Sequence, residues 1–227
     1  MEIRKWAGIL AALALILGGS GAALAAGGTI TGKVLFSGAA PQPKKMKIDK
    51  DKERCGAEMV SEELVVGADK GVQWAVVSVV GAKASPPANP PHIDQNGCKF
   101  NPRVAVVSPG ANLDILNNDK ILHNIHTYSK KNQAINKAHP KFRKKLTEKF
   151  AQTEIIKLTC DVHTWMLGWI VVSDAPTAVT DKGGAFTLTN VPPGNYSLKM
   201  WHEKLGEQTK QVTVKAGAET KVSFELR

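Results

Sequence analysis

Short runs of β-branched and other apolar residues, separated by Gly, Pro, Asn and Asp, occur along most of the chain. The first run, residues 29–36, alternates apolar and polar positions until Ser37-Gly38 interrupts it. Runs of this kind are typical of β-strands bounded by turns. Further strands are predicted at residues 64–66, 72–80, 104–107, 113–116, 154–158 and 169–172. Their spacing predicts an all-β fold, an antiparallel sandwich or barrel.

A second group of alternating segments begins near residue 175. Gly183-Gly184 and Pro192-Pro193-Gly194 supply turns between predicted strands at residues 186–188, 196–200, 212–214 and 222–226. A block of about 50 residues is close to the size at which a single core becomes marginal. We therefore predict one domain over residues 29–174 and a smaller β-module over 175–227. The module is expected to pack on the first domain or to take a strand from it, for which residues 30–36 are the candidate.

The first 25 residues have the layout of a secretory signal peptide. Arg4 and Lys5 precede an apolar run over residues 6–17, and Ala23-Leu24-Ala25 provides small residues for cleavage. The alternative is an uncleaved anchor, but the run is shorter than the roughly 20 residues that span a bilayer. We predict a periplasmic, monomeric product with no stable membrane span after cleavage. Export also excludes nucleic acid as the partner of a chain with a formal charge of +10.

The chain has three cysteines, and an oxidising compartment permits disulfides. An odd number suggests one bridge and one retained thiol. Cys55 and Cys98 each adjoin a glycine in a predicted turn, whereas Cys160 stands between an apolar run and a histidine. We predict a Cys55–Cys98 disulfide and a free thiol at Cys160.

Most of the excess positive charge lies in residues 130–149. This segment contains eight Lys and Arg residues and one acid, Glu148, for a net charge of +7. Such a run is usually a solvated loop or surface helix. The alternative is a docking face for an acidic partner, and both interpretations stay open.

Two short segments bear the residues with metal-ligand chemistry. One contains His123, Asn124 and His126, and the other is Cys160-x-x-His163-x-x-Met166. One Cys, two His and one Met form the ligand set of a blue-copper site with a long axial thioether. In an extended segment, residues three apart point to opposite faces, so we expect His123 to face the metal and His126 to lie at the surface or behind the ligands.

Other interpretations of these residues remain open. A helix over residues 123–126 would place both imidazoles on one face, and together with Cys160 and His163 they could form a tetrahedral zinc site. Met166, between Trp165 and Trp169, could instead fill the core. The remaining histidines are isolated in predicted loops and are expected to be solvated: His92, His139 and His202.

These two motifs resemble those of cupredoxins, and the short Cys-x-x-His-x-x-Met loop is similar to that of amicyanin. The resemblance implies a Greek-key β-sandwich over residues 29–174 with one type 1 copper. The implied ligands are His123, Cys160, His163 and Met166, and Asn124 would join the two ligand segments by hydrogen bonds. A dinuclear copper A centre is excluded because it needs two cysteines in the ligand loop. Residues 179–196 resemble carboxypeptidase regulatory-like β-sandwich modules, which are non-catalytic.

The function expected from the sequence is that of an exported blue copper protein that carries single electrons and is not an enzyme. Its partner would be a redox protein, such as a cytochrome or an oxidoreductase, and an acidic one would suit the basic segment. Electrons are expected to leave by the edge of His163, with Trp165 in an apolar docking patch. The alternatives are a periplasmic copper or zinc binding or storage protein without redox turnover, and a purely structural envelope module.

Overall fold

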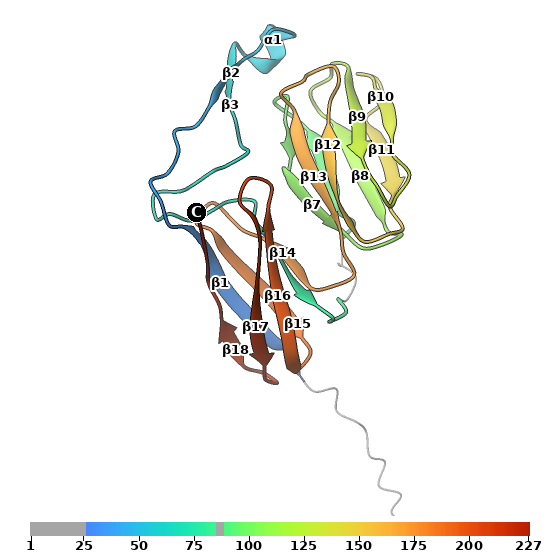
Figure 1. Cartoon of the computed structure of the whole chain (residues 1–227). Coiled ribbons are helices and arrows are strands. Elements are labelled where there is room, and N and C mark those ends of the chain that lie inside the picture. Colours follow the sequence, from blue (N-terminus) through green and yellow to red (C-terminus); the bar gives the residue numbers. More distant parts are fainter. Residues whose placement is uncertain (1–25, 85–88) are drawn as a thin grey trace, which may run out of the picture.

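The computed structural model describes residues 26–84 and 89–227, and most of the ordered secondary structure in this part is β-strand (Figure 1). Its single helix within these ranges is α1 (Lys52–Cys55). The strands form two β-sandwiches, which confirms the predicted all-β fold. The predicted signal peptide, residues 1–25, lies outside the described residues. No helix in the described ranges is long and apolar enough to cross a membrane.

The first sandwich consists of a five-stranded and a four-stranded sheet. The larger sheet has the order β10-β9-β12-β13-β7 and the smaller has the order β11-β8-β5-β6. The pairs β13–β7 and β5–β8 are parallel, and the other pairs are antiparallel. The strands, in chain order, are β5 (His92–Gln95), β6 (Phe100–Asn101), β7 (Val104–Val107), β8 (Asn112–Asn117), β9 (His123–Tyr128), β10 (Asn136–His139), β11 (Lys145–Lys149), β12 (Glu154–Thr159) and β13 (Leu167–Val172).

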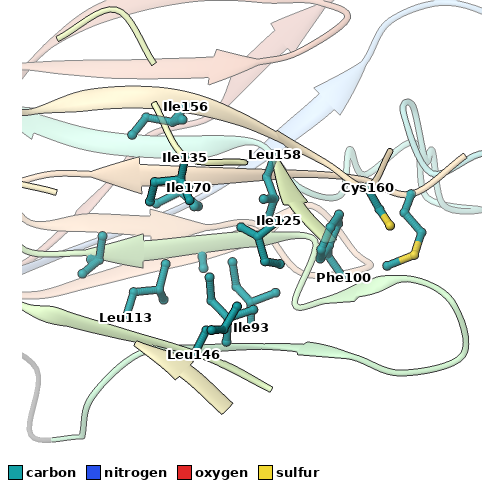
Figure 2. Packing of buried hydrophobic residues seen from close by; sticks show 14 of the residues in the cluster. Ile93, Phe100, Leu113, Ile125, Ile135, Leu146, Ile156, Leu158, Cys160 and Ile170 are labelled. Atoms are coloured by element: carbon teal, nitrogen blue, oxygen red, sulfur yellow. The ribbon is translucent and has the colours of Figure 1, made fainter. Parts of the chain in front are cut away.

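Apolar side chains from both sheets meet in one core. Ile93, Leu113 and Leu146 of the smaller sheet belong to the same buried cluster as Ile125 and Ile170 of the larger sheet (Figure 2). Their alternation with exposed positions along each strand is the pattern that a sandwich with two inner faces requires. Cys160 lies at one end of this core, so the candidate site is continuous with it.

The second sandwich combines strands from both ends of the chain. One sheet has the order β15-β1-β18, with β19 also paired to β1, and the other has the order β14-β4-β16-β17. Its strands are β1 (Gly28–Phe36), β4 (Val76–Val80), β14 (Thr177–Val179), β15 (Ala185–Val191), β16 (Gly194–His202), β17 (Gly206–Val214), β18 (Glu219–Lys221) and β19 (Phe224–Leu226).

The C-terminal module therefore takes strands from the N-terminal part of the chain. β1 pairs with three C-terminal strands, as the marginal size of the module suggested, but β4 also joins this sandwich. Ile30 and Val79 are buried in its core beside Leu198. The expected single domain over residues 29–174 thus differs from the structure, in which its first two long strands complete the other sandwich.

A small excursion between β1 and β4 reaches the end of the first sandwich. It consists of β2 (Lys45–Lys47), α1 and β3 (Glu58–Val60), and we call residues 45–60 the strap (Figure 1). The predicted disulfide between Cys55 and Cys98 is present and attaches α1 to the turn between β5 and β6. The covalent bond keeps the strap against the sandwich even though it contributes no strand to either sheet.

The two sandwiches meet through an apolar layer that also contains a buried ion pair. Trp169 and Trp201 pack edge to face with ring centroids 4.9 Å apart. The guanidinium of Arg103 donates from Nε to the carboxylate of Glu203 at 3.1 Å, and both side chains are less than a tenth exposed. Pairing of this kind is required for charges that are removed from water.

Two of the three isolated histidines are buried, contrary to the expectation that they are solvated. His202 ends β16 and is 1% exposed, and burial lowers the pKa of its imidazole to about 4. His139 ends β10 and is fully buried, with Nδ1 2.6 Å from the amide nitrogen of Gln95. Both lie at strand ends that the other sheet or sandwich covers, and of the three only His92 is exposed.

Candidate metal centre

The two motif segments meet at one end of the first sandwich. His123 is the first residue of β9, and Cys160 directly follows the last residue of β12. These strands are antiparallel neighbours, with Thr159 opposite His126. The start of β9 therefore lies beside the end of β12, and the loop that contains His163 and Met166 then leads into β13.

Three donor atoms converge in this region. Cys160 Sγ lies 3.8 Å from His123 Nδ1 and 3.8 Å from His163 Nδ1, and the two Nδ1 atoms are 3.0 Å apart. The three residues are at most 1% exposed. Within the described ranges they are the one group of His, Cys, Asp or Glu residues close enough to hold a metal ion together.

These separations fit a single small ion. Protein ligands bind such ions at about 2.0–2.1 Å through imidazole nitrogen and about 2.3 Å through thiolate sulfur. With those bond lengths, the two sulfur–nitrogen separations correspond to an angle of about 120° at a shared ion, and the nitrogen–nitrogen separation to about 95°. The donors are therefore already placed for a three-coordinate arrangement of one sulfur and two nitrogens.

The thiol of Cys160 is free and its environment favours the thiolate. Burial alone would raise its pKa, but hydrogen bonds from His123, His163 and the backbone N–H of Asn124 lower the pKa to about 6. The Asn124 N–H lies 3.4 Å from the sulfur. Since the thiolate is the form of cysteine that binds metals, the metal-free site is prepared for a cation.

His123 is held from behind by the buried carboxylate of Asp119. Its Nε2 lies 3.0 Å from Asp119 Oδ2, and both side chains are fully buried. Burial lowers the pKa of His123, but hydrogen bonding to Asp119 and Cys160 outweighs this and raises it. The bond between Nε2 and the carboxylate fixes the ring orientation and leaves Nδ1 as the nitrogen that faces the sulfur.

His163 is held in the same way by Asp51 of the strap. Its Nε2 lies 2.7 Å from Asp51 Oδ2, and the imidazole is fully buried. This differs from the expectation that the edge of His163 faces a partner. Trp165 lies 5.2 Å from the imidazole between ring centroids, but it is itself partly buried against the core.

The two other predicted site residues occupy the same region in different ways. Met166 is 1% exposed and belongs to the same core cluster as Cys160, while its axial role remains a prediction. Asn124 Oδ1 accepts a hydrogen bond from the backbone N–H of Asp161, and Asn124 Nδ2 donates to the Asp161 carboxylate at 3.2 Å. These bonds connect the segments that bear His123 and Cys160, as the resemblance implied.

His126 lies outside the donor group. Its Nδ1 is 2.9 Å from Asp161 Oδ1, and its ring stacks on Tyr128 with centroids 4.4 Å apart. β9 is extended here, so the argument from side-chain alternation holds and the four-residue zinc site that a helix would have created is not formed.

Sequence reasoning missed both carboxylates that support the imidazoles. Asp119 lies four residues before His123, a spacing that could have suggested a contact. Asp51 is 112 residues from His163 and has no local signal of its role.

A comparison with protein families agrees with the resemblance drawn for the C-terminal segment. A family model, the carboxypeptidase regulatory-like domain, matches residues 170–227. The C-terminal segment is similar to this domain. No curated protein matches the chain significantly.

Solved structures similar to part of the chain include copper proteins. A Cu-containing nitrite reductase from Thermus scotoductus SA-01 is 21% identical over 41% of this chain and 24% of its own, with a TM-score of 0.35. A purple cupredoxin from Nitrosopumilus maritimus is 19% identical over 36% and 98%, with a TM-score of 0.31. A mutant of amicyanin in its Cu(I) form is 16% identical over 43% and 98%, with a TM-score of 0.34. The chain thus spans about a quarter of the nitrite reductase.

Proposed function

We propose that this chain is a type 1 copper protein that carries single electrons. The ligands would be His123, Cys160, His163 and Met166. The observation that supports this most directly is the convergence of one thiol sulfur and two Nδ1 atoms at 3.8, 3.8 and 3.0 Å in a fully buried site. When bound there, copper would supply a reversible one-electron couple.

The surrounding residues would keep the donor positions constant during turnover. Cys160 would bind as the thiolate, and the Asn124 N–H stabilises that charge. Asp119 and Asp51 would hold the two imidazoles with Nδ1 directed inward. With four protein ligands and no exposed donor, the site has no open position for a substrate, so we propose no enzymatic reaction.

Burial of the donors favours a carrier over a store. A storage protein must release its metal to a recipient, which requires ligands that can be reached from solvent. The three donors here are at most 1% exposed. An electron, in contrast, crosses a few ångströms of protein without displacing any ligand.

We propose that the partner is an acidic redox protein that docks at the loop between β10 and β11. Lys141, Arg143 and Lys144 of this loop are exposed and form no ion pairs within the described residues. Phe142 between them is 80% exposed. The loop follows His139, which lies opposite His123 in the β10–β9 pair. The loop therefore borders the end of the sandwich that contains the candidate metal centre.

Copper titration of the purified protein tests the proposed site. Adding Cu(II) should produce intense visible absorption from thiolate charge transfer, and voltammetry should show a reversible couple. Cys160→Ser should abolish the colour, whereas His126→Ala should retain it because His126 lies outside the donor group. A wild-type protein that stays colourless with one equivalent of Cu(II) would refute the proposal, and irreversible loss of copper at the electrode would favour storage.

A carboxylate-terminated monolayer on gold can stand in for the acidic partner. Replacing Lys141, Arg143 and Lys144 by Glu should slow electron exchange with the monolayer at low salt by about tenfold or more. Electrostatic steering changes association rates by about 10–10³-fold. The matched control reverses three exposed lysines of the strap: Lys47, Lys50 and Lys52. A larger loss in the control would show that electrons pass on the His163 side.

A further inference from the structure

Asp51 has an unusual conformation at the start of α1. It occupies the N-cap position, where an Asp side chain normally accepts hydrogen bonds from the first turn. Its side chain makes no such bond, and its backbone is left-handed, with φ 49° and ψ 40°. This region is sparsely populated by residues other than glycine, and non-glycine residues found there tend to cluster at functional sites. The carboxylate is directed instead to His163 Nε2, 2.7 Å away.

The strap that holds Asp51 is fixed at three points. Cys55, four residues later, is bonded to Cys98. Arg54 donates from Nε to Asp119 Oδ1 at 2.9 Å. Ile48, three residues before Asp51, is 1% exposed and packs in the core of the first sandwich. The carboxylate therefore belongs to an anchored segment, which distinguishes it from an exposed acid that pairs with a histidine by chance.

We infer that Asp51 is a positioning residue for His163, and that the strap closes the edge of this imidazole from solvent and partners. The inference rests on the proposed metal site. The bond from Nε2 to Asp51 leaves Nδ1 as the nitrogen that faces the donor group, 3.8 Å from the Cys160 sulfur. The carboxylate also prevents the ring from turning, because a flipped ring would lose the bond at 2.7 Å.

The two imidazoles are supported by carboxylates from different parts of the chain. Asp119, which supports His123, is fully buried next to β8, whereas Asp51 is more than a third exposed in the strap. His163 thus depends on a segment that is not part of either sandwich. Loss of Asp51 should affect His163 and leave the support of His123 in place.

The test compares Asp51→Gly with Asp49→Gly. Glycine suits the left-handed backbone at position 51, so the variant removes the carboxylate without adding strain. Asp49 is an exposed acid of the same segment that makes no side-chain hydrogen bond or ion pair within the described residues, so it controls for charge. Asp51→Asn is the conservative variant, because its amide oxygen can still accept from Nε2–H.

Two readouts are expected to change in Asp51→Gly. In the metal-free protein, solvent exchange of the His163 Nε2–H, followed by NMR, should be about tenfold faster than in wild type, because the bond to the carboxylate is lost. In the copper-loaded protein, release to a chelator should be about 10–100-fold faster, the effect typical of a lost partner behind a metal-bound imidazole. Asp51→Asn should lie between, and Asp49→Gly should match wild type.

The outcomes separate this inference from the proposed function. If Asp51→Gly matches wild type in both readouts, Asp51 has no positioning role. Equal acceleration in Asp49→Gly would assign the effect to charge alone and would also overturn the inference. If wild type binds no copper, the proposed function fails, while the exchange rate of Nε2–H in the metal-free protein still measures the hold of Asp51 on His163.

Discussion

Replacing Asp119 with asparagine should destabilise the protein strongly even without metal. The side chain is fully buried and accepts four hydrogen bonds. Oδ1 accepts from the backbone N–H of Gly97 at 2.7 Å and from Arg54 Nε at 2.9 Å. Oδ2 accepts from the backbone N–H of Cys98 at 2.8 Å and from His123 Nε2 at 3.0 Å. Burial raises the pKa of Asp119, but these donors together hold it below the ordinary value.

The expected loss follows from the number of donors. An asparagine has one carbonyl oxygen, so in either orientation its NH₂ group faces two of the four donors. A buried donor left without an acceptor costs about 1–3 kcal/mol. Two such donors give a total of about 2–6 kcal/mol, with little added by the Arg54 charge, because that side chain is 44% exposed.

Denaturant unfolding of the metal-free, disulfide-intact protein at neutral pH measures this loss. Asp49→Asn is the control, since it makes the same chemical change at an exposed position. A difference below about 0.5 kcal/mol between the two variants would refute the reasoning, because it would mean that the four donors find other partners. An unchanged slope of free energy against denaturant would exclude an altered unfolded state as the cause.

Three further predictions concern other parts of the fold. Burial holds the pKa of His202 near 4 against an ordinary value of 6.5, so below pH 6.5 the unfolded state binds more protons. Stability should therefore fall by about 2 kcal/mol more between pH 7 and pH 5 in wild type than in His202→Gln, and equal falls in denaturant titrations would contradict this. Glu203→Ala leaves the guanidinium of Arg103 buried without its partner and should lower the free energy of unfolding by about 3–5 kcal/mol. The double variant Arg103→Met with Glu203→Leu removes both charges and should lower it less. Thermal unfolding measures both variants, and the reverse order would show that the Arg103 charge is satisfied elsewhere. Replacing Cys55 and Cys98 by Ala opens a loop of 43 residues and should lower stability by about 4 kcal/mol, and an unchanged denaturation midpoint would contradict that estimate.

The donor group was predictable because its signal is local. Cys160 and His163 lie in one short loop, and the choice of His123 over His126 needed only the alternation of side chains along a strand. The free thiol followed from the odd number of cysteines and from their neighbouring residues. Each of these inferences uses residues within a few positions of one another, where sequence spacing determines geometry.

Features that depend on distant pairing were predicted less well. β1 was expected to pair with the C-terminal strands because the module is too small for its own core, but nothing in the alternation of β4 distinguishes one sandwich from the other. His139 and His202 were placed in solvent by residue type, although strand ends near another sheet can be covered. Periodicity predicts that a strand exists, and it does not specify the strand's partner.

The disulfide connects the supports of both candidate imidazole ligands. Cys55 fixes the strap that carries Asp51, and the backbone N–H of Cys98 donates to Asp119 at 2.8 Å. Loss of Asp51 should therefore disturb one imidazole, whereas loss of the disulfide frees the strap and the turn that orders Asp119, and should disturb both. Cys160 adjoins neither support, so the two kinds of cysteine differ in role: the free thiol is the proposed sulfur donor, and the bridge holds the carboxylates behind the two candidate imidazole ligands.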